Sequence, residues 1–139
     1  MKPILKQNNK HFLRLDRGDE VLETLKNYCE ENNIQTGEFR AIGSTDDCTL
    51  AYYDAQKKDY IGHHFTGQHE LINLLGNISK LDNKILVHAH AVISGKDMIA
   101  KSGHAKQMKI YITCELILET MDGEIRREFN EKENIALIK

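Results

Sequence analysis

Every second residue from Met108 to Leu118 is apolar, and this alternation leaves the chain few ways to fold. Successive side chains of a β-strand point to opposite faces, so a period of two predicts a long strand with one buried face. Asp122 and Gly123 follow as a hairpin signal and predict a return strand over about residues 124–130. The positions of the alternating apolar face are Met108, Ile110, Ile112, Cys114, Leu116 and Leu118.

One helix and several shorter strands account for the rest of the sequence. After Gly18 and Asp19, a candidate N-cap, apolar residues recur at helical spacing and predict an amphipathic helix that ends near residue 32 or 33. Further strands are predicted over 11–15, 37–44, 48–53, 58–65, 70–78, 84–93 and 135–138. One helix among many strands predicts a single α+β domain over residues 1–139, with a mostly antiparallel sheet packed on the helix.

Composition limits which cellular compartment and which class of binding partner the sequence suggests. The 139 residues carry 19 Lys and Arg against 21 Asp and Glu, so the surface is not built as a whole to grip nucleic acid phosphates. The first ten residues lack the apolar stretch of a secretory signal, and no window approaches a membrane span, so we expect a cytoplasmic protein. Cys29, Cys48 and Cys114 are odd in number and widely spaced, which indicates reduced cysteines with packing roles.

Three histidines are the main candidates for a functional site in the sequence. His88 and His90 are two apart on a predicted strand and therefore project from one face, where they supply half of a tetrahedral metal shell. His104 follows Gly103 and is expected to approach from a nearby loop as a third ligand. Three imidazoles suit zinc, although nickel, copper or iron also bind such a set. The alternative is that these histidines only pack in a half-buried sheet or an interface, with no metal.

A second group of histidines, His63, His64 and His69, lacks the spacing of a single metal centre, and we interpret its members as exposed or turn residues. Glu70 opens the apolar segment 71–78 and is a candidate to lean towards the pocket of His88.

Five motifs, taken in order, resemble the PPC domain, the plant-and-prokaryote conserved family. The resemblance covers nearly the whole chain, and Ser102 is a departure, because the family often has glycine at that position. The motifs are the glycine-containing start of the helix at 16–21, the AIGS strand end at 41–44, the segment 70–79, the HxHA motif at 88–91 and the GH pair that ends at His104.

The resemblance implies an antiparallel sheet packed on a helix, a homotrimer, and a metal at His88, His90 and His104 in prokaryotic members. Plant relatives are described as DNA-binding because an AT-hook precedes the domain. This chain has no such segment, since its one proline is Pro3. A DNA-binding or regulatory role therefore rests on family analogy, and the basic residues Lys101, Lys106, Lys109, Arg126 and Arg127 form at most a modest patch.

The fold implied by the family is also similar to that of acetolactate decarboxylase, a zinc enzyme that uses an HxH pair and a later histidine. This likeness favours an alternative function, a small zinc-dependent metalloenzyme acting on a carboxylate or oxo-acid. A metal with an open position would bind the substrate. Arg40 is then a candidate carboxylate clamp, and Glu70 or Glu115 is a candidate acid or base.

Overall fold

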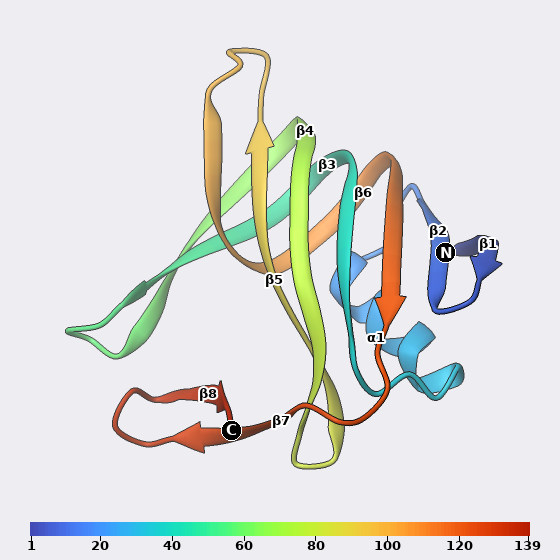
Figure 1. Cartoon of the computed structure of the whole chain (residues 1–139). Helices are drawn as coiled ribbons and strands as arrows, with labels where there is room; N and C mark the ends of the chain where they lie inside the picture. Colours follow the sequence, from blue (N-terminus) through green and yellow to red (C-terminus); the bar gives the residue numbers. More distant parts are fainter.

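The computed structural model describes residues 1–139 and places most of them in one strongly curled sheet (Figure 1). The strands pair in the order β1-β2-β6-β3-β4-β7-β8, and β5 pairs with both β4 and β6. All pairs are antiparallel except β4 with β7. The predicted α+β class with one helix is therefore confirmed. The elements are β1 Lys2–Gln7, β2 Lys10–Asp16, α1 Val21–Glu31, β3 Gly37–Asp54, β4 Asp59–Leu81, β5 Lys84–Ser94, β6 Ala100–Thr120, β7 Arg126–Asn130 and β8 Ile135–Ile138.

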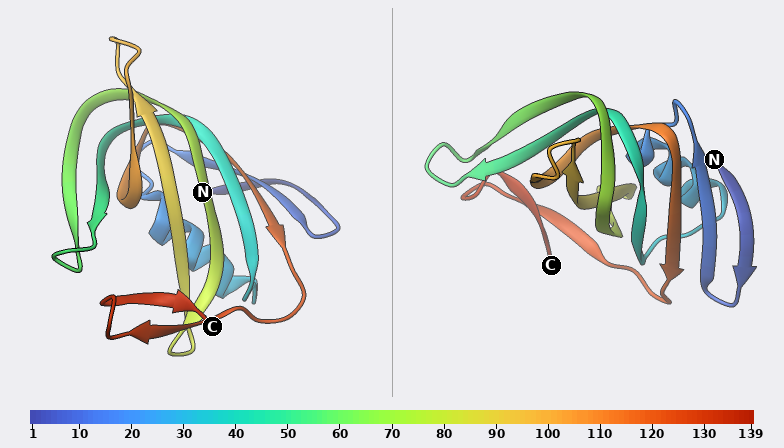
Figure 2. Two further views of the ribbon diagram at one scale, coloured as in Figure 1. Left: turned by 60° about the vertical axis from the view of Figure 1, so that its left-hand side comes forward. Right: turned by 90° about the horizontal axis from the view of Figure 1, so that it is seen from above.

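Helix α1 lies in the concave side of the sheet, which curls over it (Figure 2). Its N-cap is Glu20 and not Asp19 as predicted: the Glu20 carboxylate accepts a hydrogen bond from the backbone N–H of Glu23 at 2.7 Å. The Asp19 carboxylate instead accepts from the backbone N–H of Asp16 at 3.0 Å. The helix buries Val21, Leu25, Tyr28 and Cys29 against the strands, which forms the core. With 11 residues, α1 is too short to cross a bilayer, and the chain has no other helix.

The alternating segment lies in β6, and its apolar face is buried except at one position. Ile112 is 54% exposed, although its neighbours in the pattern, Ile110 and Cys114, are almost fully buried. The register between β3 and β6 shifts there, and the Ser44 hydroxyl accepts a hydrogen bond from the backbone N–H of Ile112 at 3.1 Å. A β-bulge therefore turns this one side chain outwards.

Two pairs of predicted strands are continuous in the structure. The segments 37–44 and 48–53 are both part of β3, and 58–65 and 70–78 are both part of β4. Register shifts after Ala41 and Thr45 bend the paired strands without ending them. The two halves of β3 thus reach both halves of β6, and the outer parts of β3 and β4 extend as a long arm (Figure 1). Strand β1 was not predicted.

The C-terminal residues form a hairpin, β7–β8, that does not pair with β6 as predicted. Both edges of that part of β6 are already taken by β2 and β3, so a return strand has no free edge there. Instead, β7 runs parallel to the end of β4. The hairpin reaches the arm through the Tyr53 hydroxyl, which donates to the Glu133 carbonyl, and through Asn134 Nδ2, which donates to the Lys58 carbonyl at 3.1 Å. The hairpin therefore extends from the C-terminal end of β4 to the tip of the arm, where β3 turns into β4 (Figure 1).

Candidate metal centre

Strand pairing brings the three predicted histidines to one place. His88 and His90 alternate with Ala89 and Ala91, which are buried in the core, so the imidazoles lie on the opposite face of β5. His104 is directly opposite His90 in the β5–β6 pair. The expectation of a loop position for His104 is wrong, because β6 already begins at Ala100.

Glycine at 103 allows β3 to approach this part of β6. A Cβ at Gly103 would meet the Ala51 carbonyl oxygen at 2.8 Å, closer than side chains normally approach backbone atoms. Ala51 in turn is paired with His104. Because residue 103 has no side chain, β3 packs closely against β6 at this point. His104 is therefore paired on both sides, with β3 and with β5, which fixes the position of the third imidazole.

The geometry of the cluster suits a single ion. The ring centroids are 5.3 Å apart for His88 and His90, 5.1 Å for His88 and His104, and 5.4 Å for His90 and His104. One nitrogen from each ring lies within 4.8 Å of the other two. Bonds of about 2.0–2.1 Å to a tetrahedral zinc ion would place the ligand nitrogens about 3.4 Å apart, so the rings would draw closer together when an ion binds.

The surroundings favour the neutral form of His104 and of His88 by lowering the pKa of each. Burial, together with the proximity of His88, His90 and Lys106, lowers the pKa of His104 to about 4. Burial also lowers the pKa of His88, and Arg127 and His90 act in the same direction. Metal ligation requires unprotonated imidazole, so at neutral pH both rings are in the form that binds metal.

One buried nitrogen in the cluster tests whether these residues fit a metal ion. The Tyr60 ring stacks on the His104 imidazole at 4.6 Å between centroids and covers it. His104 Nδ1 is buried and has no hydrogen-bond partner in the protein. A buried polar atom without a partner costs free energy, and a metal ion that accepts its lone pair removes that cost. The donor set, three imidazoles without thiolate, fits zinc or a similar divalent transition metal.

Arg127 is the residue of this site that the sequence analysis missed. It extends from β7 of the C-terminal hairpin, and its Nη2 donates to His88 Nδ1 at 3.3 Å and to Asn77 Oδ1 at 3.1 Å. Its Nε donates to the Ser79 hydroxyl at 2.9 Å, and its Nη1 donates to the Ala136 carbonyl at 3.1 Å. The sequence offered only a pair of adjacent arginines on a short strand, and no local pattern distinguishes the one that folds back onto β5.

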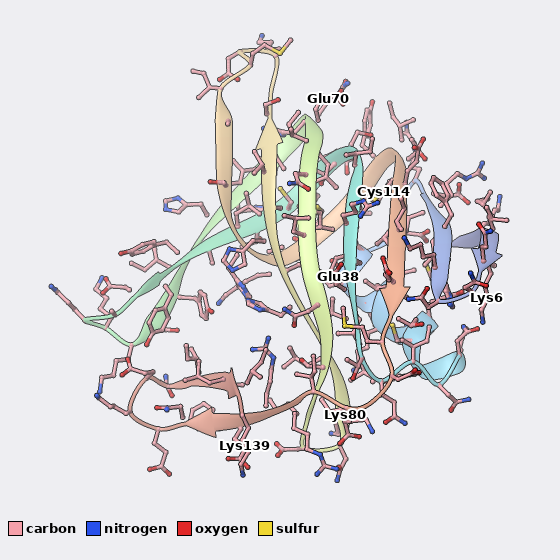
Figure 3. The ribbon with its side chains drawn as sticks, viewed as in Figure 1. Lys6, Glu38, Glu70, Lys80, Cys114 and Lys139 are labelled. Atoms are coloured by element: carbon pink, nitrogen blue, oxygen red, sulfur yellow. The ribbon has the colours of Figure 1, made fainter.

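Glu70, a candidate neighbour of His88 in the sequence, does not approach it. Asn77 is the β4 residue opposite His88, and Glu70 is opposite Ser94 at the other end of the pair. Seven residues at about 3.3 Å each separate Glu70 from Asn77 along the strand. Figure 3 shows Glu70 at the upper bend in the middle of β4, while Lys80, near the C-terminal end of β4, and the C-terminal Lys139 lie towards the bottom of the view.

Arg40 and Glu115 also lie outside the histidine cluster. They share a groove of about 200 Å³ on the exposed face of the sheet, and Glu115 and Glu70 line an adjoining one of about 340 Å³. Arg40 is opposite Leu75, which is opposite His90, so one strand separates Arg40 from the nearest histidine.

The second histidine group behaves as surface residues. His63 and His64 are exposed, and His64 Nε2 lies 2.8 Å from an Asp47 carboxylate oxygen. His69 Nδ1 lies 2.8 Å from the Gly67 carbonyl oxygen in a turn. None of the three belongs to the histidine group that could hold a metal ion.

Comparison with known proteins identifies the family. The sequence pattern of the Plants and Prokaryotes Conserved (PCC) domain matches residues 4–122. The chain is a member of the PCC domain family. The resemblance noted in the sequence motifs is thereby confirmed, and the match ends before the β7–β8 hairpin that carries Arg127. No curated protein sequence matches this PCC domain.

Solved structures share the fold over nearly their whole length. A Bacteroides thetaiotaomicron protein described as a candidate DNA-binding protein is 26% identical, with a TM-score of 0.93, and the match covers 97% of this chain and 94% of that one. A metal-containing protein from Archaeoglobus fulgidus is 29% identical, with a TM-score of 0.89 over 100% and 99% of the two chains. A plant- and prokaryote-conserved protein of Pyrococcus horikoshii is 26% identical, with a TM-score of 0.88 over 100% and 96%.

The expected likeness to acetolactate decarboxylase is present at the level of the fold. The enzyme from Bacillus subtilis subspecies spizizenii is 13% identical, with a TM-score of 0.59, and the match covers 94% of this PCC domain and 59% of the enzyme. At this identity the likeness concerns the path of the chain and carries no chemistry with it.

Proposed function

We propose that this PCC domain binds one divalent transition metal ion per chain, with zinc as the expected metal, through His88, His90 and His104. The observation that carries the proposal is the convergence of three imidazoles, one of which has a buried nitrogen without a partner. The Archaeoglobus relative, described as metal-containing, supports it. Three protein ligands leave a coordination position open, which is typical of metals that bind or activate a small molecule.

Metal content tests this proposal directly. Plasma mass spectrometry on tag-free protein should find about one metal ion per chain, and a His88→Ala, His90→Ala double variant should retain almost none, because two of the three ligands are gone. A His63→Ala, His64→Ala double variant is the matched control and should load like the wild type, since both residues lie outside the cluster. Wild-type protein that contains no metal after growth and dialysis with zinc would contradict the proposal.

We also propose a homotrimer, as the family resemblance implies, and a cytoplasmic location. The exposed sheet face supports self-association, because Ile42, Ile72, Leu75 and Ile112 are each more than half exposed there, beside the charged Arg40 and Glu115. A contiguous apolar face with charges of both signs is typical of a surface that pairs with copies of itself. Three cysteines, all buried and unpaired, support a reducing compartment.

The first candidate for the biological role is regulation through contact with DNA, proposed by analogy with the Bacteroides relative. Three of the five basic residues of the predicted patch are already engaged: Lys101 pairs with Asp97 at 3.6 Å, Arg126 pairs with Glu124, and Arg127 is part of the histidine site. Contact with DNA phosphates would therefore depend on residues such as Lys106 and Lys109, repeated in each chain of the proposed trimer.

Fluorescence anisotropy with a labelled duplex tests the DNA role. Phosphate contacts release counterions, so binding should weaken steeply between about 50 and 200 mM salt, and Lys106→Gln with Lys109→Gln should weaken it further. Binding that is absent at the lowest salt concentration, or that is unaffected by both substitutions, counts against DNA as the partner.

The second candidate is a metalloenzyme acting on a carboxylate or oxo-acid, favoured by the open metal position with a guanidinium beside it. When bound, the metal would supply Lewis acidity, and Arg127 is placed to orient a negatively charged group. Arg40, Glu70 and Glu115 line grooves on the exposed sheet face, so a clamp or acid–base role for them would require a neighbouring chain of the proposed trimer to bring its metal site against these grooves.

A further inference from the structure

The charge around the histidine cluster is positive and uncompensated. Arg127 touches His88, and Lys106 Nζ lies 5.0 Å from the centre of the Tyr60 ring that covers His104. Neither Arg127 nor Lys106 forms an ion pair with any carboxylate, and no carboxylate belongs to the cluster. A divalent cation held by the three imidazoles would add to this positive charge, so an anion would stabilise the metal-loaded site.

Arg127 is held in place by groups that do not neutralise it. A guanidinium has five N–H donors, and here four hydrogen bonds are made, to a hydroxyl, an amide oxygen, a backbone carbonyl and an imidazole. All four acceptors are uncharged. Because Arg127 is half-buried, its charge is partly removed from water without a counterion.

Metal binding at His88 would leave one N–H donor of Arg127 without its acceptor. The contact from Nη2 to His88 Nδ1 is long, at 3.3 Å, and requires that Nδ1 carry no proton. If that nitrogen gives its lone pair to the metal, the guanidinium loses this acceptor. One N–H then faces the site and another is already free, so two donors are available next to the open position.

The position of Arg127 depends on the C-terminal hairpin. Lys80 N donates to the Ile125 carbonyl at 2.9 Å at the start of β7, and Lys139 N donates to the Arg126 carbonyl at 3.0 Å at its return. With the Tyr53 contact to Glu133 at the far end, the hairpin is anchored on both sides of the cluster. The guanidinium is thus delivered to the histidines by a rigid element and not by a free tail.

We propose that the site binds a small carboxylate anion, held between the metal ion and the Arg127 guanidinium. This inference rests on the proposed metal binding at His88, His90 and His104. A carboxylate is planar and presents two oxygens, which matches both a paired guanidinium donor set and a metal position beside it. Arg127 is therefore the specificity-determining residue of the site, and the β7–β8 hairpin is the element that makes the metal centre selective for anions.

Cobalt-loaded protein provides the test, because the visible absorption of cobalt(II) changes when a ligand enters its coordination shell. Wild-type full-length protein is loaded with cobalt(II) and titrated with acetate and with pyruvate, with phosphate and chloride as comparison anions. Saturable spectral changes are expected with the two carboxylates at lower concentrations than with phosphate or chloride. In Arg127→Gln the carboxylate Kd should rise by about tenfold or more, because a charge-assisted pair is lost.

Two variants control for folding and for general charge. Arg127→Lys keeps the charge but not the planar donor pair, and its carboxylate Kd should lie between those of the wild type and Arg127→Gln. Arg126→Gln removes the adjacent arginine, whose side chain is 68% exposed and paired with Glu124, and should titrate like the wild type. Cobalt content and near-ultraviolet circular dichroism are recorded for each variant.

Each contrary result has its own meaning. A wild-type cobalt spectrum that carboxylates do not change overturns the anion site, as does an unchanged carboxylate Kd in cobalt-loaded Arg127→Gln or in Arg127→Lys. Tighter binding of phosphate than of acetate and pyruvate overturns the carboxylate class. Failure of the wild type to take up cobalt overturns the metal proposal itself, together with this inference.

Discussion

Gly76→Ala should lower the free energy of unfolding by about 2–4 kcal/mol, as expected for severe overpacking between strands. A Cβ at this position would meet the His88 carbonyl oxygen at 2.3 Å and Phe39 Cζ at 2.4 Å. Neither the backbone nor a buried ring can yield easily, so β4 and β5 must separate where His88 is held. Urea denaturation of metal-free protein measures the loss, and metal content should fall as well because a ligand strand is displaced.

Gly62→Ala is the matched control on the same strand. The nearest atom to a Cβ there is Thr49 Cγ2 at 3.3 Å, the flexible end of a side chain. We expect a change within about 1 kcal/mol and normal metal loading, because a Gly→Ala change in allowed backbone also reduces the entropy of the unfolded chain. Equal losses in the two variants would show that close packing against β5 is not the cause.

Metal-free protein should lose stability as the pH falls from 7 towards 4. The folded state lowers the pKa of His104 to about 4 by burial and by nearby His88, His90 and Lys106, and it lowers the pKa of His88 and of His11, again mainly by burial. Unfolding returns each pKa to its ordinary value of 6.5. Between these values the unfolded chain binds more protons, so stability is fully present above about pH 6.5 and is lost as the pH falls.

For His104 alone the loss should reach about 1–3 kcal/mol, after allowance for solvent screening of a half-buried ring. Urea midpoints at a series of pH values, with chelator present, measure it. His104→Gln removes one of the three groups and should flatten the pH dependence, whatever its effect at pH 7. A wild-type midpoint that stays constant between pH 7 and pH 5, or a variant with the same slope, contradicts the assignment.

Local patterns predicted the elements but not how they join. The helix from Val21 and the buried face of β6 follow from periods of 3.6 and two, which are properties of neighbouring residues. The continuity of β3 and β4 could not be predicted, because bulges after Ala41 and Thr45 interrupt the alternation while the pairing continues. The predicted partner of residues 124–130 was wrong for a similar reason: whether an edge of β6 is free depends on β2, more than a hundred residues away.

The residues of the candidate site also fall into two groups: those that local spacing predicts and those whose position depends on tertiary pairing. His88 and His90 are two apart on one strand, so their shared face was predictable. His104 was predicted as a partner, but its position within β6 depends on where the β5–β6 turn ends. Asn77 is close to His88 only because β4 pairs with β5, and Arg127 reaches His88 only because β7 pairs with β4. Arg40, Glu70 and Glu115 have suitable chemistry, yet chemistry alone does not specify which groove a side chain lines.

The place of β6 in the sheet has a consequence for how the protein is made. This strand pairs with β2, β3 and β5, so three strands synthesised before it lack a neighbour until it emerges. At about 5–20 residues per second, the chain between the end of β2 at Asp16 and the start of β6 at Ala100 takes roughly 4–17 s to translate. During that interval β2 exposes apolar side chains and an unpaired edge to solvent, so a nascent chain of this topology is open to aggregation until β6 emerges.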